Sequence, residues 1–198
     1  MKPIFTVLVL SIASCISMNA SAQWSLAPSS AELNFLSTKV LSNMNSITEQ
    51  SRFQTLSGAV SDDGELTLKV KLASVDTQVP IRDQRLRDWV FEVSKYQEAV
   101  ISAKITKANL NALAVGKPLR IKQGLILKAH GKTIPLEAEL QLVKSQNGSI
   151  YVSTTSPILL DVKQLELNKG VEKLIDVMGL ASINQQIPIT FYGKFIES

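Results

Sequence analysis

The chain has 198 residues and a formal net charge of +4, with 21 lysine and arginine residues against 17 aspartate and glutamate residues. This charge is mild and its cations are scattered, which excludes a basic surface of the kind that binds nucleic acid. The one cysteine, Cys15, and the one histidine, His130, cannot supply a disulfide, a zinc site or a haem site between them. The composition therefore predicts no metal and no nucleic-acid partner.

The first 22 residues predict a signal peptide. Lys2 gives a positive start, residues 4–12 are almost wholly apolar, and Ala20-Ser21-Ala22 is a small-x-small cleavage site. The apolar run is shorter than the about 20 residues that a membrane span needs, so no stable span is expected. Cleavage after Ala22 exports one folded domain, residues 23–198.

A competing signal lies inside the same segment. Ile12-Ala13-Ser14-Cys15 resembles a bacterial lipobox, in which the cysteine is acylated and becomes the first residue of the mature chain. Soluble release and a lipid anchor at Cys15 are therefore alternatives. The sequence favours release, because its small-x-small site is well formed.

The rest of the chain alternates apolar and polar residues with a period of two, which is typical of strands with one buried face. The clearest examples are residues 65–73 and 133–143, and the same alternation runs through 119–127 and 187–195. The shorter strand candidates are residues 33–35, 53–60, 101–105 and 150–154.

Short turns separate these runs. Asp62-Asp63-Gly64, His130-Gly131-Lys132 and Gln146-Asn147-Gly148 each place glycine or asparagine where a hairpin needs a positive φ. The pattern gives about eight strands, mostly in hairpin order. It predicts an all-β fold, either an antiparallel barrel or a sandwich.

The polar face of the strands decides between a membrane barrel and a soluble one. Lys69, Lys71, Glu137 and Glu139 lie in mid-strand, and such charges are hard to crowd into an eight-strand lumen. Aromatic residues make up 6% of the chain, too few for the girdles of a membrane barrel. We therefore expect the aliphatic face inside and the charges in water. An interior of this size is either filled by side chains or holds one small ligand, and both alternatives stay open.

Two segments interrupt the strand pattern. Residues 80–92 carry three arginines beside Trp89. Val162 to Leu180 places apolar residues at a roughly helical spacing, which predicts a helix. Gly179 is its predicted stop, while Gly170 in its middle weighs against one uninterrupted helix.

A hydrolase would have to use His130, and the chain contains no Gly-x-Ser-x-Gly nucleophile motif. Because His130 lies in a tight turn before Gly131, a structural hydrogen bond is the favoured role. The sequence therefore predicts no catalytic residue.

A series of short motifs resembles the YceI-like family of exported lipid-binding proteins. The motifs run in order along nearly the whole mature chain. They are Trp24-x-Leu26, Leu33-x-Phe35, Ser57-Gly58-Ala59-Val60, Asp63-Gly64-Glu65-Leu66, Arg82-Asp83-Gln84-Arg85-Leu86-Arg87 with Phe91 and Tyr96, and His130-Gly131-Lys132-Thr133-Ile134-Pro135-Leu136.

The resemblance implies an eight-stranded, antiparallel, lipocalin-like barrel with minor helices. It implies a tunnel that holds an extended amphiphile, typically an isoprenoid chain, a periplasmic location and no cofactor. The candidate site is then the inner face of the barrel. Its expected apolar lining is Leu33, Phe35, Phe53, Leu66, Leu68, Val70, Leu72, Trp89, Phe91, Leu125, Leu127, Leu136, Leu140, Ile187, Ile189 and Phe191.

On this resemblance the charged segment becomes a crossover. We expect a short helix near Arg82–Trp89 over one barrel mouth, capped by Asp83, with Trp89 and Phe91 plugging or lining the entrance. The expected polar rim is Arg82, Arg85 and Arg87. Alternatively, ion pairs of Arg82 with Asp83 and of Arg87 with Asp88 pin a loop, and Trp89 is ordinary core.

The leading hypothesis is a non-catalytic periplasmic carrier that sequesters a long apolar lipid, such as an isoprenoid or a quinone-like amphiphile, in the barrel. The alternative is a packed envelope or stress module without a lipid ligand, which uses the helix near Val162–Leu180 as its interaction surface. The oligomeric state stays open, with a homodimer as one alternative.

Overall fold

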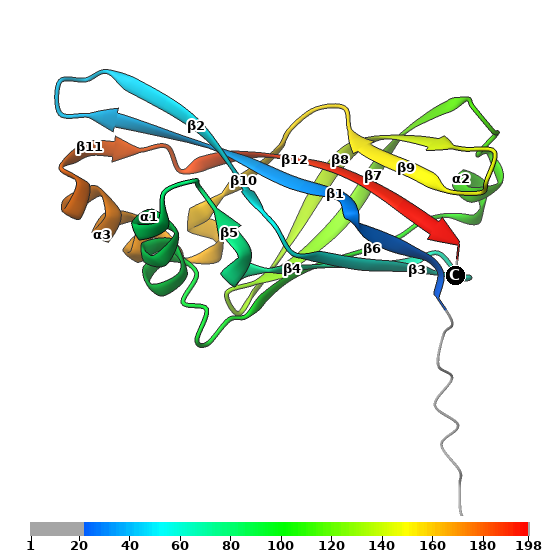
Figure 1. Ribbon diagram of the computed structural model, residues 1–198, viewed down its shortest axis with the longest axis horizontal. Coiled ribbons are helices and arrows are strands. Elements are labelled where there is room, and N and C mark those ends of the chain that lie inside the picture. The colour runs from blue at the N-terminus through cyan, green and yellow to red at the C-terminus, as the bar shows by residue number, and fades with distance from the viewer. Residues whose placement is uncertain (1–21, 198) are drawn as a thin grey trace, which may run out of the picture.

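The computed structural model describes residues 22–197, in which eight antiparallel strands close into a barrel and further strands extend its sheet beyond one end (Figure 1). Residues 1–21, which hold most of the predicted signal peptide and Cys15, and residue 198 lie outside the described part. The eight-stranded antiparallel barrel is confirmed. The alternation alone left a sandwich open beside it, and the family resemblance implied the barrel.

The described chain has a sheet of twelve strands and several short helices. The strands are β1 (Ala22–Leu41), β2 (Ser46–Phe53), β3 (Leu56–Ser61), β4 (Glu65–Lys71), β5 (Val75–Asp76), β6 (Glu98–Lys104), β7 (Pro118–Ala129), β8 (Lys132–Lys144), β9 (Ile150–Thr154), β10 (Ile158–Asp161), β11 (Leu180–Ile183) and β12 (Gln186–Glu197). The helices are η1 (Leu72–Ser74), α1 (Pro80–Arg85), η2 (Leu86–Val90), α2 (Lys107–Asn111), η3 (Val162–Leu165) and α3 (Asn168–Met178).

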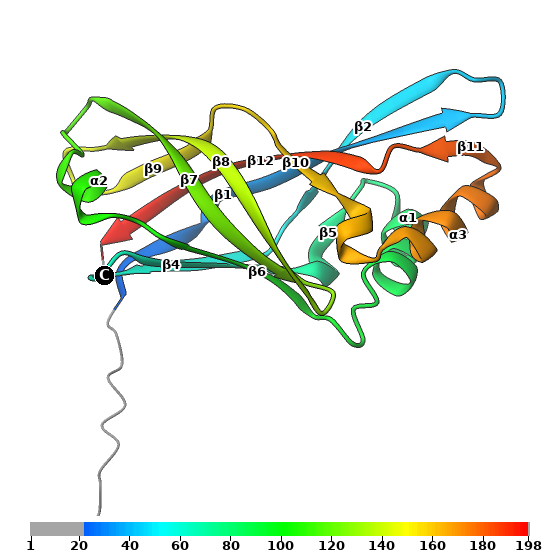
Figure 2. The same cartoon turned by 180° about the vertical axis from the view of Figure 1, so that it is seen from behind.

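The barrel closes where β12 pairs with β1. Around the barrel the order is β1, β3, β4, β6, β7, β8, β9 and β12, and Leu33 of β1 lies opposite Phe191 of β12. The second half of β1 runs on beyond the barrel, where it pairs with β2 and β11. Both views place α1 and α3 at this same end, beneath β2 and β11, while α2 lies at the other end (Figures 1 and 2).

The β7–β8 hairpin illustrates why the apolar face points inwards. Leu125 lies opposite Leu136 on the inner face, whereas Lys122 on the outer face lies 3.5 Å from a carboxylate oxygen of Glu139. The turn between the strands places two consecutive residues at positive φ, 49° at His130 and 73° at Gly131, as a tight hairpin requires. The predicted assignment of faces is therefore confirmed for this hairpin.

The structure differs from the sequence prediction in its second and third strands. Residues 53–60 were predicted as one strand, but β2 ends at Phe53 and β3 begins at Leu56. The β1–β2 hairpin, whose turn spans residues 42–45, was not predicted. Its turn, Ser42-Asn43-Met44-Asn45, has two asparagines but takes its positive φ of 65° at Met44, which is not a residue that favours this conformation.

Both predicted helical segments form. Residues 162–180 make two helices, η3 and α3, because Glu166 between them adopts a left-handed conformation with φ of 57°. Gly179 ends α3 with φ of 61°, as predicted. The crossover helix begins at Pro80, a residue that favours the first turn of a helix, and continues from α1 into the wider π-turn of η2.

Gly170 does not break α3, and a close contact explains why glycine is required there. A Cβ atom at this position would lie 2.2 Å from the carbonyl oxygen of Trp89 and 2.6 Å from the Cα atom of Val90. The backbone of α3 therefore packs directly on the backbone of η2, and this contact joins the two helical segments at the mouth end of the barrel.

We predict that Gly170→Ala lowers the free energy of unfolding by about 1–3 kcal/mol, the usual cost of overpacking. At an unobstructed helical position the same change would raise stability by about 1 kcal/mol. Urea unfolding followed by circular dichroism measures the difference. Gly124→Ala in β7 is the control for the same substitution without an obstructing contact, because nothing lies within 4 Å of its Cβ position. An unchanged or increased stability for Gly170→Ala would contradict the close contact.

Candidate functional site

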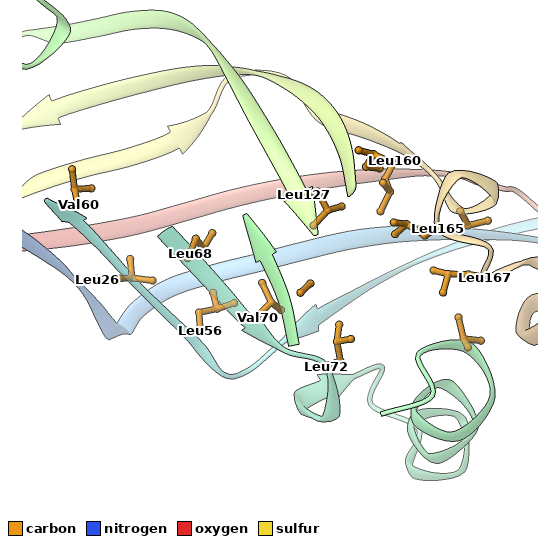
Figure 3. Packing of buried hydrophobic residues seen from close by; sticks show 14 of the residues in the cluster. Leu26, Leu56, Val60, Leu68, Val70, Leu72, Leu127, Leu160, Leu165 and Leu167 are labelled. Atoms are coloured by element: carbon orange, nitrogen blue, oxygen red, sulfur yellow. The ribbon is translucent and has the colours of Figure 1, made fainter. Parts of the chain in front are cut away.

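A cavity of about 290 Å³ lies inside the barrel and continues beneath the β1–β2–β11 extension. Its wall is built from the inward faces of the barrel strands and from the helical segments at both ends. Figure 3 shows leucine and valine side chains from several of these elements converging on the interior. The barrel is therefore not filled by its own side chains.

Fifteen of the sixteen predicted lining residues lie on this wall. They come from β1, β2, β4, η1, β7, β8 and β12 and from the residue that follows η2. They are Leu33, Phe35, Phe53, Leu66, Leu68, Val70, Leu72, Phe91, Leu125, Leu127, Leu136, Leu140, Ile187, Ile189 and Phe191.

Trp89 is the exception and lies off the cavity wall. Its ring is half-buried, with the Lys173 ammonium nitrogen 4.3 Å and the Arg85 guanidinium carbon 5.6 Å from the ring centre. The side chain thus packs between α1 and α3 and neither plugs nor lines the entrance. The turn of η2 carries Val90 and Phe91 to the wall in its place.

Sequence reasoning missed the part of the wall that the helices contribute. Leu165, Val171 and Leu174 from η3 and α3 line one end of the cavity, and Leu110 of α2 also lines it. The helical spacing of the apolar residues in α3 was visible in the sequence, but the surface that they cover was not. Trp24, at the start of β1, is a further wall residue that was not predicted.

Most polar groups on the cavity wall form hydrogen bonds with other groups of the chain. Gln123 donates through Nε2 to the carbonyl oxygen of Gly124 at 2.9 Å. Thr154 Oγ1 accepts from the backbone N–H of Phe191 at 3.1 Å. Because these groups are satisfied within the wall, the surface presented to the cavity is hydrocarbon.

His130 is fixed between two acceptors. Its Nδ1 lies 3.0 Å from the carbonyl oxygen of Leu165, and its Nε2 lies 3.0 Å from a carboxylate oxygen of Glu92. The Tyr96 ring packs against the imidazole at a tilt of 49°, with the ring centres 4.3 Å apart. Hydrogen bonds from Lys95 and then from His130 lower the pKa of the Glu92 carboxyl group. The histidine thus joins the β7–β8 turn to η3 and to the segment after η2.

The cavity opens beneath the extension. Among the described lining residues, Asn184 in the connection between β11 and β12 is exposed, whereas the others are buried or half-buried. Every second residue of β1 lies on its inward face, where Phe35 is followed by Ser37 and then by Lys39. The wall therefore changes from apolar to polar as it approaches this mouth.

Three charged side chains meet beside the mouth. Lys39 Nζ donates to Glu49 Oε2 at 2.7 Å, and Arg82 Nη1 donates to the same oxygen at 2.5 Å. Arg82 also donates through Nε to the hydroxyl oxygen of Thr77 at 3.0 Å. Because Lys39 and Glu49 belong to the β1–β2 hairpin and Arg82 to α1, the network ties the extension to α1.

The predicted roles of the charged crossover need correction. Arg82 pairs with Glu49 rather than with Asp83, whose carboxylate accepts from the backbone N–H and the hydroxyl of Thr77 at 2.8 and 2.6 Å. Asp83 therefore does not cap α1, which starts three residues earlier after Val79 without a side-chain cap.

The arginines of the predicted rim lie near the mouth end but not on the cavity wall. Arg82 belongs to the ion network, Arg85 lies over Trp89, and Arg87 is half-buried on η2. Within residues 22–197, no three histidine, cysteine, aspartate or glutamate side chains gather as a metal site would require. The helices in this part of the chain are all too short or too polar to cross a membrane.

A family model of the YceI-like domain matches residues 24–195. Among solved structures, a polyisoprenoid-binding domain from Saccharophagus degradans, implicated in plant cell wall breakdown, superposes with a TM-score of 0.84. The two chains are 29% identical, and the match covers 90% of this chain and 100% of that one.

Two more distant structures share the fold. BcnA of Burkholderia cenocepacia is 15% identical, with a TM-score of 0.60 over 85% of this chain and 98% of its own. The YCEI protein of Campylobacter jejuni is 19% identical, with a TM-score of 0.53 over 75% of this chain and 85% of its own. A comparison with curated protein sequences found no significant match.

We predict that the stabilisation contributed by Glu49 depends on pH. Hydrogen bonds from Lys39 and then from Arg82 lower the pKa of this carboxyl group below its ordinary value of 4.5. The contribution is therefore present above about pH 4.5 and is lost as the pH falls through the lowered pKa. It is small, because the Glu49 side chain is 37% exposed and solvent screens the pair.

The measurement is the free energy of unfolding of Glu49→Gln and of the unaltered chain, from neutral to acid pH. The unaltered chain is expected to be the more stable at neutral pH, with the gap closing in acid. A gap that stays constant across this range would show that the carboxylate charge contributes nothing.

Proposed function

The chain belongs to the YceI-like family, and we propose that it is a non-catalytic periplasmic binding protein that sequesters a long apolar lipid inside its barrel. The lipid class is an isoprenoid or a related amphiphile. The observation that carries this proposal is the apolar cavity, which runs through the barrel and continues beneath the extension.

The energetics favour a hydrocarbon ligand. Each methylene group that leaves water for an apolar site contributes about 0.8 kcal/mol. The wall offers leucine, isoleucine, valine and phenylalanine side chains on every strand of the barrel, and its polar groups are largely occupied by hydrogen bonds to the chain. A ligand that is mostly polar would lose its hydration here without replacement.

The relative from Saccharophagus degradans supports an isoprenoid as the ligand class. That protein is a polyisoprenoid-binding domain, and its whole length is covered by the match. The alternative of a packed module without a ligand is less well supported, because the interior contains a cavity where such a module would have side chains.

Sequestration without catalysis agrees with the setting of His130. Both of its ring nitrogens are already within hydrogen-bond distance of acceptors from the chain, Leu165 and Glu92. A general base needs a ring nitrogen that can take a proton from a nucleophile. The histidine therefore serves to join three segments of the barrel end.

Exchange of the lipid would take place at the mouth. The ion network of Lys39, Glu49 and Arg82 spans the β1–β2 hairpin and α1 on either side of it. These side chains can part without disturbing the barrel strands, because the hairpin projects beyond the closed barrel.

We predict that the mature protein starts at Gln23 and is released as a soluble periplasmic protein. The intact mass of the protein recovered from the cell envelope tests this. A start at an acylated Cys15 would add several residues and a lipid to the mass, and would mean membrane anchoring instead.

We predict that Leu140→Trp blocks lipid uptake. Leu140 is half-buried on the cavity wall, so a larger side chain fills space that the lipid would occupy. Binding of a fluorescent polyprenol by the delipidated protein is the measurement. Gln141→Trp is the matched control, because Gln141 is next in β8 and faces outwards, and uptake should be unchanged.

The free energy of unfolding of Leu140→Trp distinguishes a lipid-binding cavity from a core filled by side chains. If the interior were filled, Leu140→Trp would overpack the core and lower the free energy of unfolding by about 1–3 kcal/mol. Undiminished polyprenol uptake by Leu140→Trp, or failure of the unaltered protein to bind any isoprenoid, would overturn the proposed function.

A further inference from the structure

The far end of the extension is free of charged residues. Residues 40–48, which form the β1–β2 turn and its flanks, contain no aspartate, glutamate, lysine or arginine, and neither do residues 177–193, which run from the end of α3 through β11 into β12. The two segments meet, because Leu41 pairs with Leu180. The barrel strands β7 and β8, by contrast, carry several lysine and glutamate residues. We call residues 40–48 and 177–183 the extension tip.

The extension tip exposes aliphatic side chains to solvent. Met44 is 73% exposed, Val177 is 48% exposed and Ile47 is 40% exposed. Both views place the β1–β2 turn and the start of β11 at the end of the molecule farthest from α2 (Figures 1 and 2). The exposed aliphatic residues therefore gather at one end of the molecule, on a surface without charges.

The conformation of the β1–β2 turn does not explain why methionine occupies position 44. Met44 takes a left-handed conformation with φ of 65°, which asparagine adopts more readily than methionine. Asparagines stand on both sides of it, and the Asn43 side chain accepts from the backbone N–H of Asn45 at 3.1 Å. An exposed apolar side chain in a conformation that disfavours it indicates a role outside the fold.

The extension tip is continuous with the mouth of the cavity. Ile183, at the end of β11, and Asn184 both line the cavity. The backbone N–H of Asn184 donates to the carbonyl oxygen of Thr38 at 2.8 Å, which joins this segment to β1. On β1, Ser37 lines the cavity four positions before Leu41, about 13 Å along the strand. A surface that receives the tip therefore also meets the mouth.

We propose that the extension tip docks on the surface of a lipid bilayer, and that the lipid passes between bilayer and cavity there. The inference rests on the proposed function, because a water-insoluble lipid needs a path that avoids water. Aliphatic side chains enter the surface of a bilayer favourably, whereas charged side chains are costly there. Tryptophan, tyrosine and arginine, which dominate the binding energy of protein interfaces, are absent from the tip, and this favours a lipid surface over a protein partner.

The test measures how fast a fluorescent polyprenol passes from phosphatidylethanolamine–phosphatidylglycerol vesicles to the delipidated protein. Transfer by contact has a rate that rises in proportion to the vesicle concentration, whereas a lipid that first crosses water arrives at a rate independent of it. We expect the first behaviour. The double variant Met44→Asp, Ile47→Asp should transfer about tenfold more slowly, because it removes aliphatic burial and brings two carboxylates to the bilayer.

Val115→Asp is the matched control. Val115 is 52% exposed and follows α2, at the opposite end of the molecule, so the same change of an exposed aliphatic residue should leave the transfer rate unchanged. Salt supplies a second control. Because the tip has no charges, the rate should change less than about twofold in about 0.5 M sodium chloride, which screens electrostatic attraction. A steep fall with salt would assign docking to cationic residues elsewhere and overturn the inference.

Met44→Asn separates docking from folding. Asparagine suits the left-handed conformation at this position, so the free energy of unfolding should stay the same or rise. The transfer rate should nevertheless fall, because the most exposed aliphatic side chain of the tip is lost. An unchanged rate would overturn the role of Met44 in docking, and a loss of stability would contradict the argument that its local conformation is unfavourable.

Uptake of the same polyprenol from detergent solution separates this inference from the proposed function. All the variants should take it up there as the unaltered protein does. Equal transfer rates from vesicles for the tip variants and the unaltered protein would overturn docking while lipid binding stands. Failure of the unaltered protein to take up polyprenol from either source would overturn both. A dimer of the unaltered protein that the tip variants dissociate, seen by analytical ultracentrifugation, would assign the tip to a second copy of the chain and overturn docking on a bilayer.

Discussion

The pairing of β12 with β1 is the constraint on which the rest of the structure depends. It turns an alternating sheet into a closed surface, so that every inward residue shares one interior and every outward residue meets water. Leu33 and Phe35 on β1 face Phe191 and Ile189 on β12 across this seam. Once β12 pairs with β1, the apolar side chains of all the barrel strands point into one interior, and this interior is the candidate site.

The interior continues past the barrel because the second half of β1 runs beyond it and pairs with β2 and β11 to form the extension. The helices η2 and α3 beneath this extension are held close to one another by the contact of Gly170 with the backbone of η2. Their own side chains, such as Val171 and Leu174, line the space instead of filling it. A cavity that continues from the barrel to the extension can hold an extended apolar chain.

The strands and most of the cavity wall could be predicted from the sequence, because strand periodicity assigns a face to each residue. Leu66, Leu68 and Val70 lie on the wall for that reason alone. The closure into a barrel rather than a sandwich was implied by the family resemblance. Periodicity contains no information on how elements pack across a gap, and the misplacement of Trp89 follows from this. The partner of Arg82 was missed for the same reason, since Glu49 lies far from it in the sequence and meets it only where the β1–β2 hairpin packs against α1.

The most direct test of this account is native mass spectrometry, combined with organic extraction, of the protein purified gently from its own cell envelope. The account predicts a protein that carries one long apolar lipid, which the extraction releases and identifies as an isoprenoid. A protein that arrives without any bound mass, and that takes up neither an isoprenoid quinone nor a polyprenol when these are supplied, would contradict it.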